Sequence, residues 1–266
     1  MYINEVLAQR IEAQQTQDEA ATIEVLQHRF SVPSAHARPS LGGYAIQTGS
    51  GYPTNRGTGI GFQRTITPSE FNDFEAFYSA AGLPAELELC PFVDASLMTF
   101  VTQRCYTIYR FYNTYLLRLS PHEPSRFRSP MIDIHQVKEE ECHLWARTVA
   151  GTTQADDPMV TLAQATFYRP SVMCFLSTIQ GEVAGGAALS ITNGIGTLSF
   201  MGTVPAFRRQ GVQNALIAER LAEASAQGCD LALCSTDPGN QSQRNVQRHG
   251  FSLAYTVNFG IMWLEF

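Results

Sequence analysis

The residues with the clearest chemical meaning are two arginines and a glycine that precede a helix-like run. Arg208, Arg209 and Gly211 lie in the segment VPAFRRQGVQNAL, residues 204–216. The first four amides of a helix have no partner within it and lie at the positive end of its dipole. Arginines add positive charge, and a glycine lets the backbone approach a bulky anion or adopt a positive φ. The pattern predicts a site for a phosphate or diphosphate group.

The elements around this segment should expose it at a strand-to-helix turn. We expect a strand over 196–204, which Pro205 ends, and a helix over 212–227 with apolar residues at helical spacing. The segment lacks the Gly-Lys-Ser/Thr end of a nucleotide P-loop, so a nucleoside triphosphate with magnesium is disfavoured. A glycine-rich stretch at 57–61 is also unsuited to a dinucleotide, because its third glycine is misplaced and no βαβ unit follows.

The rest of the second half alternates helices and strands. Hairpins at the centre of a sheet that helices flank give the class α+β, and not a doubly wound sheet. The expected elements are strands at 131–137, 172–180, 183–192 and 231–235, helices at 139–150, 158–167 and 242–248, and final strands after Phe251.

The first half repeats this order of elements. Residues 74–119 and 217–266 each give a helix, a glycine turn, an apolar strand ending in L-x-L-C, a short helix ending in Gln-Arg, and two strands. A repeat of this length indicates two copies of one α/β unit, because a solenoid would repeat about every 20–50 residues. Chance similarity between two generic segments is the alternative, and the matched order of elements argues against it.

Two further features organise the chain. The first 30 residues carry apolar positions at helical spacing and predict one or two helices, whose two apolar faces suggest a helical hairpin. Residues 31–57 are expected to be mostly loop with a strand at 44–47. The stretch SPHEPSRFRSP, residues 120–130, contains three prolines and is the best candidate for a linker. We therefore expect domains at 1–125 and 126–266.

Two motifs carry a resemblance to a known family. The segment TVPAFRRQGVQ, residues 203–213, resembles the acyl-CoA-binding signature V-x-P-x-x-R-x-x-G-x-G/A of the GNAT N-acetyltransferase superfamily. The later segment GNQSQRNVQRHGF, residues 239–251, is similar to a second signature of that superfamily, a small helix that ends in Gly-Phe. The resemblance covers about residues 131–266. Through its repeat, the first half resembles the same superfamily without the RxxG. The resemblance implies two GNAT-like domains, each a mixed, mostly antiparallel sheet flanked by helices, the first a degenerate copy.

The resemblance also implies a binding site for acetyl-CoA or a related acyl-CoA. In that superfamily the diphosphate lies on the loop amides, and the pantetheine chain pairs like an extra strand with the preceding strand. The small helix would face pantetheine or adenine, although its polar residues could instead cap it. The residues expected to bind the cofactor are Met201, Gly202, Thr203, Arg208, Arg209, Gln210, Gly211, Val212, Gln213, Asn214, Ser242 and Asn245.

Two positions depart from the superfamily pattern. Gln213 stands where glycine or alanine is usual, so its side chain would either crowd the diphosphate or hydrogen-bond to it, and we expect weakened binding. Val246 stands where many members carry a tyrosine thought to protonate the leaving thiolate. Either another acid supplies that proton or the thiolate leaves unaided. Tyr255 is the candidate acid, with core packing as the alternative.

Acyl transfer to nitrogen also needs a deprotonated amine and a polarised thioester carbonyl. Strand amides near 201–203 could hold the carbonyl oxygen without any particular side chain. Cys174 and Cys234 have apolar neighbours, which is typical of inert core cysteines. No Ser-His-Asp or Gly-x-Ser-x-Gly pattern supports a hydrolase, and the scattered histidines predict no metal site. The candidate bases, each more typical of a surface or structural residue, are His135, Glu139 to Glu141, Glu182 and His249.

Composition limits the partners. A net charge of −6 disfavours nucleic acid, and no apolar run approaches the roughly 18 residues that span a bilayer. The opening MYINEVLAQRIEAQQ lacks the features of a signal peptide, so we expect a cytoplasmic protein. The leading hypothesis is an N-acetyltransferase that acylates a primary amine of a small molecule or protein, as a monomer or homodimer. The alternatives are an inactive acyl-CoA sensor or interaction module, and a scaffold that binds no CoA.

Overall fold

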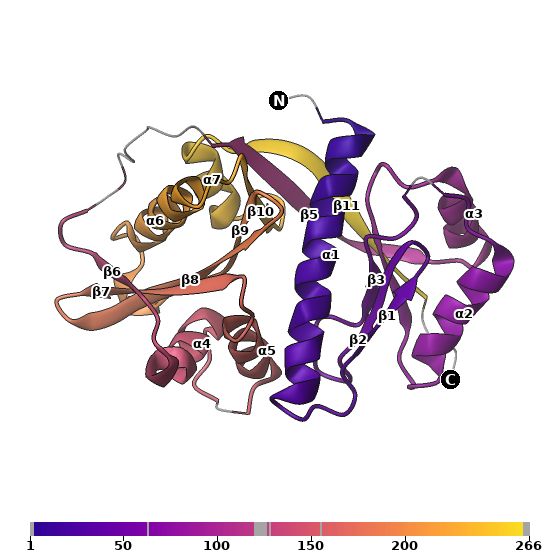
Figure 1. The fold of residues 1–266 in the computed structure, drawn as a ribbon, viewed down its shortest axis with the longest axis horizontal. Coiled ribbons are helices and arrows are strands. Elements are labelled where there is room, and N and C mark those ends of the chain that lie inside the picture. Colours follow the sequence, from indigo (N-terminus) through magenta and orange to yellow (C-terminus); the bar gives the residue numbers. More distant parts are fainter. Residues whose placement is uncertain (1–2, 63, 120–126, 128, 155, 263–266) are drawn as a thin grey trace. The chain divides into compact units, whose positions relative to one another are not determined.

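The computed structural model describes residues 3–62, 64–119, 127, 129–154 and 156–262 (Figure 1). The chain divides into two compact units. Unit 1 comprises Met1–Asn113 with Ala254–Phe266, and unit 2 comprises Thr114–Leu253. The expected domains are 1–125 and 126–266. The first segment of unit 1 instead ends at Asn113, and the segment from Ala254 onward belongs to unit 1 and not to unit 2. Most of the candidate linker lies outside the described residues.

Unit 2 contains the segment that the sequence singled out. Its strands lie in the order β10-β9-β8-β7-β6, all antiparallel except the parallel pair β10 and β9, with the end of β5 (Thr107–Arg118) beside β10. Its elements are β6 (Asp133–Gln136), η1 (Glu139–Glu141), α4 (Cys142–Ala150), α5 (Pro158–Phe167), β7 (Val172–Ile179), β8 (Glu182–Thr192), β9 (Ile195–Thr203), η2 (Pro205–Phe207), α6 (Val212–Ala226), β10 (Leu231–Thr236) and α7 (Gln241–Arg248).

Two tight turns set the register of the central hairpins of unit 2. Gln180 and Gly181 have φ of 53° and 82°, and Asn193 and Gly194 have 52° and 74°. Positive φ at both central residues matches the right-handed twist of the flanking strands, so these turns favour hairpins. The expected α+β class, with a mostly antiparallel sheet between helices, is confirmed.

Helices pack against both faces of the unit 2 sheet (Figure 1). On one face, α4 and α5 bury Trp145, whose Nε1 donates to the carbonyl of Ala187 at 3.2 Å. Gly186 lies directly under this ring, where a Cβ would come within 3.0 Å of it. On the other face, α6 and α7 bury Val212 and Leu216 in a separate cluster. The small residues of β8 thus let helices approach closely enough to close both cores.

Unit 1 has the strand order β1-β2-β3-β4-β11-β5. Its core is built by α2 and α3 over the sheet, and α1 packs against β1 and β2. Its elements are α1 (Glu5–His28), β1 (His36–Ser40), β2 (Gly43–Gln47), β3 (Arg56–Thr58), α2 (Pro68–Ser79), β4 (Ala85–Leu89), α3 (Ala95–Gln103), most of β5, and most of β11 (Ser252–Met262).

Two expectations for unit 1 need correction. The first 30 residues form one helix and not a hairpin, because Asn4 caps its start and no glycine or proline interrupts residues 5–28. The segment 31–57 holds three strands and not one. The order of the repeat is confirmed up to its end, as α2-β4-α3-β5 and α6-β10-α7-β11. The two final strands expected in each copy are wrong, because within the described residues each copy ends in one long strand.

The last strand explains why the units differ from the expected domains. β11 pairs antiparallel with β4, from Asn258 opposite Leu89 to Met262 opposite Ala85. The end of β5 lies instead beside β10, where Thr114 and Ser235 place their hydroxyl oxygens 3.4 Å apart. The final strand of each copy of the repeat therefore lies beside a strand of the other copy: β11 beside β4, and β5 beside β10.

Candidate functional site

The segment between β9 and α6, which we call the 205–214 corner, turns sharply through two left-handed residues. Pro205 to Phe207 form a single 3-10 turn, and the amide of Phe207 donates to the carbonyl of Val204 at 2.9 Å. Arg209 and Gly211 then adopt φ of 65° and 89°. A non-glycine residue rarely takes such a φ, so the backbone at Arg209 is in an uncommon conformation.

The amides of the corner are open. Among the described residues, none accepts a hydrogen bond from the backbone N–H groups of residues 209–214, and the first helical bond runs from the amide of Ala215 to the carbonyl of Gly211 at 3.0 Å. Residues 208–211 are exposed to solvent. Consecutive unpaired donors at the positive end of a helix are what an oxyanion requires, and two arginines flank them. The described residues thus leave a run of amide donors without an acceptor at the position where the sequence predicts the anion site.

The strand ahead of the corner leaves part of one edge unpaired. β9 pairs with β10 only from Ile195 to Leu198, and within the described residues the register ends there, opposite Cys234. On its other side β9 pairs with β8 as far as Thr203, with a bulge near Phe200, whose φ is 45°. The edge of residues 199–203 that faces away from β8 therefore has no strand partner among the described residues.

Three of the predicted cofactor-binding residues are joined by hydrogen bonds. Gln213 Nε2 donates to Ser242 Oγ at 3.1 Å, and Asn245 Nδ2 donates to Gln213 Oε1. The alternative that Ser242 and Asn245 cap α7 is wrong, because Asn240 is the cap and accepts from the amide of Gln243 at 2.8 Å. Gln213 is thus held toward α7, which explains how a long side chain fits at a position where the superfamily has a small one.

Sequence reasoning missed a buried arginine beneath β9. Arg220 of α6 is 0% exposed, and its guanidinium donates to the carbonyls of Leu216 and Ala188, both at 3.0 Å, and of Ser199 at 3.3 Å. It also contacts Met201 Sδ at 3.0 Å. No carboxylate among the described residues pairs with it, and burial lowers its pKa to about 10. A charge at an apolar helical position, one turn after Leu216, was the available signal.

The candidate nucleophiles of unit 2 are packed in its core. Cys174 and Cys234 are both buried, and burial raises the pKa of each thiol, that of Cys234 to about 11. A thiol with such a pKa is uncharged and weakly nucleophilic at neutral pH. Val246 is also fully buried, so no proton donor stands at the position of the superfamily tyrosine.

Tyr255 lies in unit 1 and is buried, as the core-packing alternative predicts. It is 6% exposed, and its hydroxyl donates to Glu12 Oε1 at 2.7 Å. Burial and the nearby Glu12 carboxylate raise the pKa of Tyr255 well above its ordinary value. A phenol with a raised pKa is a poor donor to a thiolate. Its role as the acid stays a prediction, and these contacts weigh against it.

Of the predicted bases, His135, Glu139, Glu140 and Glu182 are exposed, and Glu141 and His249 are partly buried. His135 Nε2 and Glu141 Oε1 are 3.0 Å apart, and Glu139 Oε1 accepts from the hydroxyl of Tyr168 at 3.2 Å. A hydrogen bond from the amide of Lys138, followed by that from His135, lowers the pKa of Glu141, so this carboxylate is a weaker base than an ordinary glutamate. Exposed and partly paired positions give none of these residues a feature that marks a catalytic base.

The equivalent corner of unit 1 is closed by its own side chains. Thr67 caps α2 and receives a hydrogen bond from the amide of Glu70, and the Glu70 carboxylate accepts from the amide of Thr67 at 2.9 Å. The amide of Ile66 donates to Ser96 Oγ at 2.8 Å. Arg64 also pairs with Glu70. The chain thus supplies its own anion at this helix start.

The described residues show no sign of a membrane-spanning helix or of a metal site. None of their helices combines the length and hydrophobicity that crossing a membrane requires. Their His, Cys, Asp and Glu side chains nowhere gather in a group of three that could hold a metal ion.

Comparisons with known proteins agree with the geometry. The family model described as "Acetyltransferase (GNAT) family" matches residues 135–251. No curated protein sequence matches the chain.

Solved structures resemble nearly the whole chain. A GCN5-related N-acetyltransferase from Kribbella flavida is 17% identical with a TM-score of 0.65, covering 91% of this chain and 95% of that one. A tandem GNAT protein from the clavulanic acid biosynthesis pathway, solved without acetyl-CoA, is 12% identical with a TM-score of 0.66, covering 95% of both chains. An acetyltransferase from the GNAT family of Colwellia psychrerythraea is 14% identical with a TM-score of 0.53, covering 94% of this chain and 96% of that one. Identities this low establish a fold of two GNAT-like domains, and not a substrate.

Proposed function

We propose that unit 2 transfers an acetyl or other acyl group from acyl-CoA to a primary amine, because the acetyltransferase (GNAT) family model matches residues 135–251. The observation that carries the proposal is the 205–214 corner, where the amides of residues 209–214 are unpaired and exposed residues surround them. A diphosphate supplies the oxygens that these donors lack. The acceptor would be an amine of a small molecule or protein.

The residues of unit 2 fit such a cofactor in three places. The corner amides, with Arg208 and Arg209, would bind the diphosphate. The open edge of β9 at Met201 to Thr203 would pair with the pantetheine chain, which would bring strand amides to the thioester oxygen. Ser242 and Asn245, already joined to Gln213, would flank the chain of the cofactor.

The chemistry would depend on positioning more than on a dedicated acid. Val246 is buried where a tyrosine donor would stand, so we propose that the thiolate leaves without a proton from this position. Holding the two reactants in the reactive geometry lowers the activation free energy, by about 7–11 kcal/mol in well-oriented intramolecular reactions. Arg220, whose guanidinium contacts Ser199 and Met201, would hold the bulged strand in place.

The test has two stages. Calorimetry of the full chain with acetyl-CoA should show binding, and free-thiol release should then be followed with a panel of polyamines, amino acids, aminoglycosides and lysine peptides. Binding with amine-dependent thiol release supports the proposal. Binding without release across the panel would indicate a sensor, and no binding at about millimolar acetyl-CoA would remove every acyl-CoA function.

A further inference from the structure

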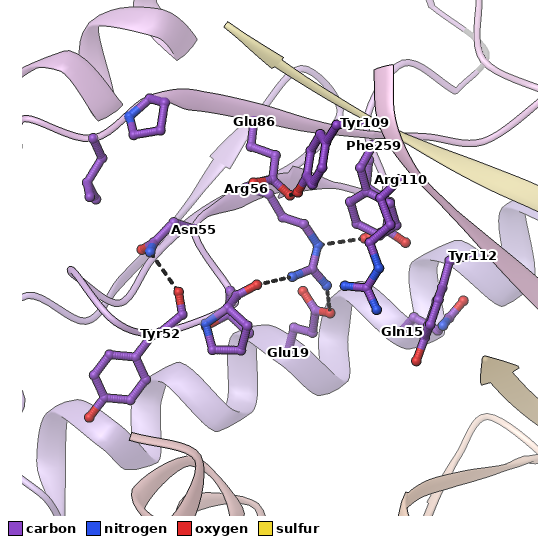
Figure 2. A pocket seen from close by; sticks show the side chains of 15 residues that line it. Gln15, Glu19, Tyr52, Asn55, Arg56, Glu86, Tyr109, Arg110, Tyr112 and Phe259 are labelled. Atoms are coloured by element: carbon purple, nitrogen blue, oxygen red, sulfur yellow. Dashed lines mark hydrogen bonds and ion pairs between the residues drawn. The ribbon is translucent and has the colours of Figure 1, made fainter. Parts of the chain in front are cut away.

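Unit 1 contains a pocket of about 420 Å³ that the acyl-CoA proposal does not use (Figure 2). α1 contributes Glu19, β3 contributes Arg56, β4 contributes Glu86, and β5 contributes Tyr109 and Arg110. Pockets that hold small molecules have volumes of about 300–1,000 Å³ and combine aromatic surface with a few polar groups. Its volume lies within that range, and its lining combines aromatic rings with a larger share of polar side chains.

The rim of the pocket is fixed before any ligand arrives. Asn55 Oδ1 accepts from the amides of Thr48 and Gly49 at 2.7 and 3.0 Å, and its Nδ2 donates to the carbonyls of Gly49 and Tyr52 at 2.8 and 3.0 Å. Figure 2 shows Asn55 bound to Tyr52 beside the pocket. One side chain thus holds the whole 48–55 loop, which reduces the ordering cost of binding.

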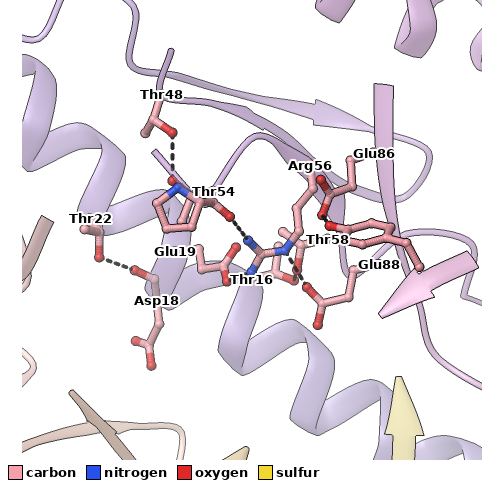
Figure 3. Close-up of polar contacts among 12 residues, drawn as sticks. Thr16, Asp18, Glu19, Thr22, Thr48, Thr54, Arg56, Thr58, Glu86 and Glu88 are labelled. Atoms are coloured by element: carbon pink, nitrogen blue, oxygen red, sulfur yellow. Dashed lines mark hydrogen bonds and ion pairs between the residues drawn. The ribbon is translucent and has the colours of Figure 1, made fainter. Parts of the chain in front are cut away.

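The charges behind the pocket are not balanced. Arg56 Nε donates to Glu88 Oε2 at 2.8 Å, its NH1 donates to the carbonyl of Pro53 at 3.2 Å, and its NH2 pairs with Glu19 (Figure 3). Glu12 is 2% exposed and adds a third carboxylate close enough to interact with both glutamates. Glu19 Oε2 is buried without a hydrogen-bond partner among the described residues. Several carboxylates therefore share one arginine whose donors are already committed.

The pKa values follow this imbalance. Burial raises the pKa of Glu12 to about 8 and that of Glu19 to about 7, and the Glu88 carboxylate adds to both shifts. Glu86 also has a raised pKa, mainly because of burial. A positive charge placed in the pocket would stabilise all of these carboxylates in their ionised form.

The opposite wall is aromatic and already contacts cations. The rings of Tyr109 and Tyr112 lie 6.4 and 6.3 Å from that of Phe259, centroid to centroid. The guanidinium of Arg110 lies 4.9 Å from the ring of Tyr112. Glu86, which is only partly buried, accepts from the Tyr109 hydroxyl at 2.6 Å and presents its carboxylate at this wall (Figure 2).

We propose that this pocket binds a compact aliphatic ammonium ion, with its N–H donors on Glu86 and its methylene groups against Tyr109, Tyr112 and Phe259. An anion would meet several carboxylates, and of the two arginines that line the pocket Arg56 is already paired with glutamates. A neutral ligand would bring no positive charge to the Glu86 carboxylate. The inference concerns binding to unit 1 alone and stands whether or not unit 2 transfers an acyl group.

The test is calorimetry of the full chain without CoA, with putrescine as the cation, 1,4-butanediol as its neutral isostere and succinate as its anionic counterpart. Putrescine should bind, and the other two should bind at least about tenfold more weakly. Glu86→Gln should weaken putrescine binding by about tenfold or more, because the amide keeps the shape and the Tyr109 contact but loses the charge. Glu24→Gln, which changes an exposed carboxylate of the same unit outside the pocket, should leave the affinity unchanged.

Several results would overturn the proposal. These are no detectable heat at about 10 mM putrescine, equal binding of putrescine and butanediol, tighter binding of succinate, or equal affinities in Glu86→Gln and the unchanged chain. Should Glu86→Gln unfold, Tyr112→Leu serves as the second variant, since it removes an aromatic ring and no carboxylate; full putrescine affinity in that variant would also contradict the proposed site.

Discussion

The two units carry the same order of elements and bury opposite charges. Unit 2 buries Arg220 among carbonyl groups with no carboxylate on its guanidinium in the described chain. Unit 1 buries Glu12, Glu19 and Glu88 around Arg56. Their helix starts differ in the same sense, because the 205–214 corner is open to an anion while Glu70 occupies the start of α2. The start of α6 thus leaves amide donors without an acceptor, and the start of α2 is occupied by a carboxylate of the chain itself.

The buried cation of unit 2 gives the largest expected effect. Arg220→Met should lower the free energy of unfolding by about 2–3 kcal/mol, because three carbonyl groups lose a donor. It should also raise the KM for acetyl-CoA, since Met201 loses its contact. Denaturant unfolding measures the first effect, with the exposed Arg244→Met as a control expected within about 0.5 kcal/mol. Unchanged stability would mean that the packing of α6, and not the charge, fixes β9.

The buried carboxylates of unit 1 should make its stability fall as pH rises. The pKa of Glu12 is about 8 in the folded chain against an ordinary 4.5, so the folded state keeps a proton that the unfolded state releases. Its contribution is full below about pH 4.5 and is lost as pH rises through about 8. Between pH 5 and pH 9, the free energy of unfolding should fall by on the order of 2 kcal/mol less in Glu12→Gln than in the unchanged chain. Guanidinium unfolding of both chains at pH 5 and pH 9 measures this difference. An equal fall in the free energy of unfolding of the variant would mean that another group, and not Glu12, titrates.

The open corner of unit 2 should be sensitive to added bulk and charge. Gly211→Asp should raise the dissociation constant of acetyl-CoA at least about tenfold, or 1.4 kcal/mol, and Arg209→Glu should do the same. Gly228→Asp is the matched control, because Gly228 also has a positive φ and lies just beyond the other end of α6. Calorimetry compares the three. If the Gly228 variant lost as much affinity as the Gly211 variant, backbone strain and not the anion site would explain the result.

The closed corner of unit 1 should matter for stability alone. Thr67→Ala removes the cap of α2 and should cost about 1 kcal/mol of unfolding free energy. Acetyl-CoA affinity should not change, since Glu70 still occupies this helix start. A changed affinity would show that the two helix starts are less different than their contacts indicate.

The smallest expected effect concerns Tyr255. Because its hydroxyl is committed to Glu12, Tyr255→Phe should leave kcat within about twofold. Steady-state kinetics at saturating acetyl-CoA measure this. A drop of kcat of about a hundredfold with an unchanged KM would restore Tyr255 as the acid.

The comparison also shows which features the sequence could predict. The helix from Val212, the hairpin turn at Gln180–Gly181 and the order of elements in the repeat follow from local signals, namely proline, glycine and the spacing of apolar residues. The partner of β11 does not, because β4 is far away in the sequence and both strands carry the same alternating pattern.

The candidate site was predictable to a similar extent. The corner and its flanking residues came from a local motif and its resemblance. Arg220 did not, since an arginine is normally assigned to a solvated face and only the packing of α6 shows it to be buried. The pocket of unit 1 combines residues from α1, β3, β4 and β5, which no spacing along the chain brings together.

The pairing of β11 with β4 has a consequence for synthesis on the ribosome. Unit 1 begins with the first helix of the chain, yet its sheet stays incomplete until residues 254–262 have been made. At about 5–20 residues per second, the exposed edge of β4 waits on the order of 10 seconds after β5 is complete. During that interval the nascent chain presents an unpaired strand edge, so the emerging protein depends on whatever shields that edge from its neighbours.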